Sequence, residues 1–248
     1  SVLFYQLYVL GDGRLVTDGH RNVAVGAISV GGIAVDSVGS LYVAGRSVPM
    51  PPIPPSYGIF KQDAIALATV ASSPNGVPAQ PRQIWSRTNT ADTSNPDSPQ
   101  LFEPTGIAVD PFGIYWGNKG RGVNAQVGSV VKASREAPAV QPEKALHPMS
   151  DNVDSVISLV LTPLNVFYGS GGAVYAVPVG KTGGSCGGDG SQCPRVAVDE
   201  LLNPTGMIWD GDGTVYIADN GRGAIYGLPS GSATAHELEM VVAAPGVH

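Results

Sequence analysis

Short apolar runs separated by polar turns dominate the chain. The pattern of an apolar run, Asp-x-x-Gly and a second apolar run with a tyrosine occurs in Gly32–Ala44, Gly106–Gly117 and Gly206–Ala218. The aspartate can cap such a turn through the backbone, and the glycine can take the left-handed conformation. Each copy therefore predicts a β-hairpin. A weaker fourth copy, Ser158–Gly169, has Thr162 in place of the aspartate.

Further apolar runs predict two more strands after each hairpin. The third strands are expected at Ala64–Val70, Gly128–Ala133, Ala173–Val179 and Ala224–Leu228. The fourth strands are expected at Gln83–Ser86, Glu143–Leu146, Arg195–Val198 and Glu237–Val242. The later copies recur at roughly 50 residues, the period of a propeller blade, and the first interval is longer. The pattern predicts an all-β fold, a β-propeller of four-stranded blades.

The two ends of the sequence predict part of another blade. Val2–Leu10 and Val23–Ala27 fit a third and a fourth strand without the inner pair. We therefore expect four full blades plus one half blade, in a propeller of five or six blades when complete. The missing inner strands would come from residues outside this sequence, from a partner, or from another closure. A partner strand added to an exposed blade edge would make the chain part of a larger assembly.

The long first interval contains a proline-rich insertion at about residues 47–58, between the second and third strands of its blade. Such a segment favours polyproline II, either as a stiff surface loop or as a ligand for an aromatic-lined groove, and the loop is the commoner case. We interpret residues 1–248 as a single β-propeller domain with this insertion.

Composition narrows the picture. The 33 glycines and 21 prolines leave little room for long helices, and 43% hydrophobic residues are too many for a disordered chain. The net charge is −6, and the 14 lysines and arginines form no basic cluster, so we expect no nucleic-acid partner. Apolar runs stay below the roughly 18 residues that a membrane span needs.

The run Pro204–Arg222 resembles the NHL-type repeat of β-propellers. Pro104–Arg121 is similar, and its Ile114-Tyr115-Trp116 portion also looks like YWTD-type propellers. The resemblance implies that the first strand of each blade lines a central channel. It also implies that loops between second and third strands gather with the blade connectors on one face. That face would hold the candidate binding residues Arg46, Glu103, Asn118, Lys119, Arg121, Asn203, Asp219, Asn220 and Arg222.

The resemblance also admits an enzyme. Gluconolactonase-like propellers hold a divalent metal at the channel mouth through carboxylate and asparagine ligands, which suit calcium. The candidate ligands here are Glu103, Asn118, Asn203 and Asp219. The equivalent loops of the other blades offer only Ser170 and Arg46, so half of the ligand shell lacks candidates. We therefore predict no cofactor, with one calcium or other divalent ion in a hydrolase or lactonase as the alternative.

Other catalytic patterns are weaker still. Zinc lyases of the NHL group use histidine ligands, but the four histidines here include no short-spaced pair. No Gly-x-Ser-x-Gly elbow is present, so we predict no catalytic residue. Asp210-Gly211-Asp212-Gly213 lacks EF-hand spacing and fits a hairpin turn. Trp116 and Trp209 are expected in the core, whereas Trp85, beside Arg82 and Arg87, is our candidate for an exposed contact residue.

The two cysteines, Cys186 and Cys193, lie close together in a glycine-rich segment that can bend into disulfide geometry. A disulfide is favoured over two reduced thiols, and a zinc site would need further ligands. A disulfide would place the protein in an oxidising compartment, and we expect it to be extracellular or secreted. The sequence thus favours a non-enzymatic, secreted or surface β-propeller that acts as a protein-interaction or structural assembly module. Carbohydrate binding is a weaker alternative, because only 7% of the residues are aromatic.

Overall fold

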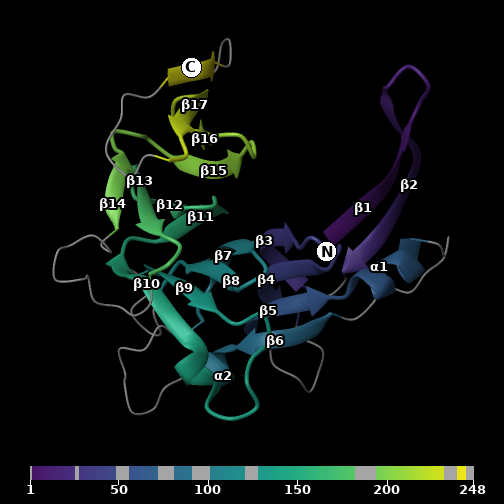
Figure 1. The fold of residues 1–248 in the computed structure, drawn as a ribbon, viewed down its shortest axis with the longest axis horizontal. Coiled ribbons are helices and arrows are strands. Elements are labelled where there is room, and N and C mark those ends of the chain that lie inside the picture. Colours follow the sequence, from purple (N-terminus) through teal and green to yellow (C-terminus); the bar gives the residue numbers. More distant parts are fainter. Residues whose placement is uncertain are drawn as a thin grey trace.

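Four antiparallel sheets of four strands make up most of the molecule (Figure 1). The computed structural model describes residues 2–25, 28–48, 56–71, 81–90, 101–120, 128–181, 194–231 and 239–243. In every sheet, the strands pair in the order in which they follow one another along the chain. Each sheet is therefore a meander, the blade of a β-propeller.

The blades are numbered in chain order. Blade 1 contains β3 (Ile28–Val35), β4 (Leu41–Ser47), β5 (Tyr57–Gln62) and β6 (Arg82–Ser86). Blade 2 contains β7 (Pro104–Val109), β8 (Ile114–Asn118), β9 (Gly128–Ala133) and β10 (Leu146–Val153). Blade 3 contains β11 (Val156–Leu161), β12 (Asn165–Ser170), β13 (Ala173–Pro178) and β14 (Arg195–Val198). Blade 4 contains β15 (Pro204–Trp209), β16 (Thr214–Asp219), β17 (Ala224–Pro229) and β18 (Glu239–Ala243).

The first strands of the blades, β3, β7, β11 and β15, contact one another in sequence order around an arc (Figure 1). Neighbouring blades pack face to face. Trp85 of blade 1 and Trp116 of blade 2 share one hydrophobic cluster, and Phe167 of blade 3 shares another with Ile217 of blade 4. The chain is thus an all-β propeller of four-stranded blades, as the sequence predicted.

The hairpin turns form as the Asp-x-x-Gly pattern predicted. Asp36 Oδ1 accepts the backbone N–H groups of Val38 (3.1 Å) and Ser40 (2.8 Å). Asp210 Oδ1 accepts three such groups, those of residues 212, 213 and 214, so its segment is a hairpin turn. Gly39 has φ of +87°, a conformation that favours glycine.

In blades 1 and 2, the second carboxylate oxygen of the turn aspartate binds a tyrosine on the next strand. Tyr42 donates its hydroxyl hydrogen to Asp36 Oδ2 (3.3 Å), and Tyr115 donates to Asp110 Oδ2 (2.9 Å). Blade 3 replaces both partners. Thr162 replaces the turn aspartate. Phe167, which pairs with Val160, occupies the position equivalent to the tyrosine.

The structure corrects two predicted strands. The segment expected as the third strand of blade 1 forms the helix α1 (Ala64–Ala71), and the third strand, β5, precedes it. The fourth strand of blade 2, expected at Glu143–Leu146, begins only at Leu146, because Pro142–Ala145 forms the 3-10 helix η1. A second short helix, α2 (Arg87–Thr90), follows β6.

Helix α1 lies on the side of blade 1 that faces away from blade 2. Its Leu67 packs against the buried cluster of Ile28, Leu41, Val43 and Phe60. The helix also contacts β2 (Figure 1). It therefore covers a sheet face that no other blade covers among the described residues.

The predicted half blade takes the form of a hairpin. β1 (Val2–Val9) and β2 (Leu15–Val25) pair antiparallel in a two-stranded sheet that projects beside blade 1 (Figure 1). The pairing agrees with the expected third and fourth strands, but β2 begins earlier than Val23. Of the proline-rich insertion, residues 49–55 lie outside the described part of the chain.

Candidate functional site

A recess of about 320 Å³ opens between blades 1 and 2, at the end of the blades where second and third strands are joined. Arg46 near the end of β4, Tyr57 at the start of β5, Glu103 in the blade connector and Lys119 after β8 line it. The structure thus brings together three of the residues that the sequence placed on this face, namely Arg46, Glu103 and Lys119.

Tyr57 contacts two other residues that line this recess. Its hydroxyl donates to Glu103 Oε1 (3.0 Å), and the Arg46 guanidinium lies over its ring, 5.7 Å from the centroid. Burial raises the pKa of the Tyr57 phenol, and the bond to the Glu103 carboxylate raises it further. Tyr57 therefore stays a neutral hydrogen-bond donor and fixes the direction of the Glu103 side chain.

The aromatic contacts continue away from the recess. The rings of Tyr57 and Phe102 are 5.3 Å apart, and the Arg87 guanidinium lies 5.4 Å from the Phe102 centroid. We call Arg46, Tyr57, Phe102 and Arg87 the Arg–aromatic stack. Both of its arginines are exposed, and both rings are half-buried. A cation over an aromatic face is attracted by the ring quadrupole, so the stack holds its arginines in place.

Two glycines that line the recess lie very close to the backbone of a neighbouring strand. A Cβ atom added at Gly31 would lie 2.2 Å from the carbonyl oxygen of Pro104, and one at Gly45 would lie 2.2 Å from that of Ser29. Contacts this short are not tolerated, so both positions require glycine and keep the floor of the recess a backbone surface.

Asn118, another predicted site residue, is fully buried. Its Oδ1 accepts the backbone N–H of Phe102 (3.1 Å), and its Nδ2 donates to Ser129 Oγ (3.0 Å). The Asn118 side chain therefore links blade 2 to the connector that contains Glu103. It is not exposed on the face where the sequence placed it.

Asp219 has the same role in blade 4. Its side chain accepts the backbone N–H groups of Leu202 (2.9 Å), Asn203 (2.8 Å) and Gly221 (3.0 Å). Around it, the exposed Asn203 and Asn220 are joined through their backbones, and the Arg222 side chain donates to the carbonyl of Glu200. Blades 2 and 4 thus use a buried polar side chain to hold the preceding connector.

Three of the four candidate metal ligands already bind other groups of the protein. Asn118 and Asp219 bind connector backbone, and Glu103 binds Tyr57. Among the described residues, no group of three His, Cys, Asp or Glu side chains has the arrangement of a metal site. Arg121, Cys186 and Cys193 lie outside the described residues.

The prediction that Trp85 is an exposed contact residue is wrong. Its exposed fraction is 0%, and its ring packs 6.1 Å from that of Trp116. Its Nε1 donates to the Ser134 carbonyl oxygen (3.0 Å). A loop of blade 2 covers this outer strand, a long-range contact that no local pattern indicates. Trp116 is buried and Trp209 half-buried in a hydrophobic cluster, as predicted.

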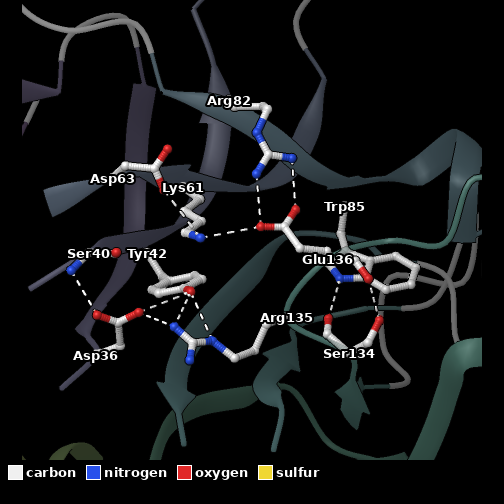
Figure 2. Close-up of polar contacts among 10 residues, drawn as sticks. All are labelled: Asp36, Ser40, Tyr42, Lys61, Asp63, Arg82, Trp85, Ser134, Arg135 and Glu136. Atoms are coloured by element: carbon white, nitrogen blue, oxygen red, sulfur yellow. Dashed lines mark hydrogen bonds and ion pairs between the residues drawn. The ribbon is translucent and has the colours of Figure 1, made fainter. Parts of the chain in front are cut away.

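That loop, Ser134–Glu136, forms a polar clasp between blades 1 and 2, which sequence reasoning missed (Figure 2). Glu136 accepts two hydrogen bonds from Arg82 (both 2.8 Å) and pairs with Lys61 (3.3 Å). The hydrogen bond from Arg82 is the main cause that holds the pKa of Glu136 below its ordinary value.

Arg135 forms the second half of the clasp (Figure 2). It donates to the Tyr42 hydroxyl from Nη2 (2.7 Å) and from Nε (3.1 Å), and it pairs with Asp36. Because each charged group of the clasp already has a partner of opposite charge, the arrangement fits a joint between blades better than a reaction centre.

No protein-family model matches the chain, and no curated protein matches its sequence. Solved structures with a similar fold include the nidogen/laminin complex, at 11% identity and a TM-score of 0.48, over 95% of this chain and 91% of that chain. A calcium-binding protein, regucalcin from Agrobacterium tumefaciens, has 12% identity and a TM-score of 0.48, over 88% and 74%. Virginiamycin B lyase from Staphylococcus aureus with quinupristin has 10% identity and a TM-score of 0.47, over 99% and 61%. The assignment as a propeller rests on the strand order and blade packing described above.

Proposed function

We propose that the chain is a non-enzymatic, secreted or surface β-propeller module that binds a protein partner, and that the recess with its Arg–aromatic stack is the binding surface. The observation that carries the proposal is the stack itself. Arginine and tyrosine are prominent among the residues that contribute most to protein–protein binding. Here Arg46 and Arg87 are exposed and already positioned by the two rings.

Preorganisation supports this role. Ordering a long side chain on binding costs about 0.5–1.5 kcal/mol. Stacking of both arginines and the bond from Tyr57 to Glu103 reduce this cost, because these side chains are held before a partner arrives.

Charge indicates the chemistry of the partner. Arg46 and Lys119 line the recess together with one carboxylate, Glu103, and Arg87 lies beyond it over the Phe102 ring, whereas the whole chain has a net charge of −6. This local positive excess favours an acidic segment of a protein partner, since complementary charges raise the association rate and select the orientation. Completion of a blade edge by a partner strand stays a separate prediction.

The first test uses a fluorescent glutamate-rich peptide as the probe and measures anisotropy at low salt. We expect saturable binding that weakens by about tenfold or more in Arg46→Glu, because the substitution reverses the charge beside Tyr57. The control is Arg195→Glu, which makes the same charge change on the exposed outer strand β14. Equal weakening in both variants, or no saturable binding to the wild type, would contradict the proposal.

A further inference from the structure

At the opposite end of the blades lies a larger cavity, which is open to solvent. The hairpin-turn ends of the first strands of all four blades surround a volume of about 890 Å³. Cavities that bind small molecules commonly have volumes of about 300–1,000 Å³. No single blade forms this cavity, which is distinct from the recess between blades 1 and 2.

Aliphatic side chains from every blade line the cavity. They include Ile33 of β3, Val109 of β7, Leu161 of β11 and Ile208 of β15. Ile33 and Ile208 are 53% and 66% exposed, because they lie on the faces of blades 1 and 4 that no other described blade covers. Exposed apolar side chains that gather on a concave surface indicate a binding site.

The charged groups at the rim are already compensated. Arg135 is paired with Asp36, which also accepts two hydrogen bonds from its own turn. Asp110 accepts the backbone N–H groups of Phe112 and Gly113 (both 2.7 Å) and the hydroxyl hydrogen of Tyr115. An anionic ligand would have to compete with Asp36 for Arg135, and a cationic one with these donors for Asp110.

We propose that this cavity binds a neutral, largely apolar small molecule. The apolar walls favour such a ligand, because it removes the exposed aliphatic side chains from water, and the compensated rim gives no preference to a charged one. This activity is independent of the protein partner at the other end of the blades.

The test titrates the protein with N-phenyl-1-naphthylamine, a neutral dye that fluoresces in apolar surroundings. We expect saturable binding to one site in the wild type, and a loss of affinity of at least about tenfold in Ile33→Asp, because a carboxylate would then enter the apolar wall. The matched control is Ile65→Asp on helix α1, where the side chain is 83% exposed and remote from the cavity lining.

A second variant, Val35→Phe, enlarges an exposed side chain of β3 that lines the cavity, without adding charge, and should also abolish the saturable signal. Circular dichroism verifies that each variant is folded. Three results would overturn the proposal: the same affinity in Ile33→Asp and Ile65→Asp, equally tight binding of an anionic naphthalene sulfonate dye, or a dye signal that appears only when light scattering detects dimers.

Discussion

At the scale of single residues, Asp219 shows how one side chain can hold a whole connector. It is 1% exposed, and the backbone groups that it binds belong partly to residues far back in the chain, Leu202 and Asn203. Burial by itself raises the pKa of this carboxyl, but the hydrogen bonds from backbone N–H groups outweigh burial and lower the pKa below its ordinary value of 3.8. Folding therefore favours the ionised form.

Replacing Asp219 by alanine should lower the free energy of unfolding by about 3 kcal/mol at neutral pH, because buried N–H groups lose a charged acceptor. The stabilisation by a carboxyl whose pKa is lowered on folding is present above the unfolded pKa and disappears as the pH falls through the folded value. Urea unfolding should thus show a gap between wild type and Asp219→Ala that narrows below about pH 4. Asp212→Ala, in an exposed turn, is the control, and an equal effect there would refute the assignment.

At the scale of elements, helix α1 provides a direct test of how blade 1 is covered. Leu67 packs on the buried cluster of β3, β4 and β5, whereas Ile65 on the same helix is 83% exposed. Leu67→Ala should destabilise the protein by about 1.5 kcal/mol, and Ile65→Ala should change stability by less than about 0.5 kcal/mol. The unfolding midpoints of the two variants distinguish them. Equal midpoints would mean that the helix does not stabilise blade 1.

Elements with local turn signals could be predicted from the sequence, and elements without such signals could not. The four hairpins follow from Asp-x-x-Gly or its Thr162 variant, because the capping bonds lie within a few residues. The apolar run at Ala64–Val70 has no such signal. Its alanines and leucine favour a helix, but a continuous apolar run also fits a buried strand.

The candidate site shows the same division. Arg46, Glu103 and Lys119 could be placed because they flank predicted hairpins. Tyr57 was missed because it begins a strand directly after the proline-rich segment, where the strand was expected later. Phe102 and Arg87 join the stack only through contacts between blades 1 and 2, and no spacing along the chain encodes those contacts.

At the scale of the whole molecule, blades differ in how many of their faces are covered. Every residue of β8 and β12, the second strands of blades 2 and 3, is buried. In blade 4, the residues of β16 alternate between buried and half-buried. Blades 2 and 3 are thus packed on both faces, and blade 4 on one face only among the described residues.

Hydrogen exchange followed by mass spectrometry should reflect this difference. We expect the slowest exchange in β8 and β12 and faster exchange in β16, because a strand covered on one face opens at a lower free-energy cost. β4, with α1 over its second face, should exchange slowly in the wild type and faster in Leu67→Ala. Exchange in β16 as slow as in β8 would show that blade 4 is covered on both faces in solution.

In blades 1 and 2, the bond between turn aspartate and strand tyrosine makes these two positions interdependent. A carboxylate has one oxygen for the turn and one for the phenol, whereas threonine has a single oxygen, which binds within the turn of blade 3. Phe167 fits this arrangement, since it has no hydroxyl to satisfy. Anyone who transplants a hairpin from one blade of this protein to another should therefore move both residues as a unit.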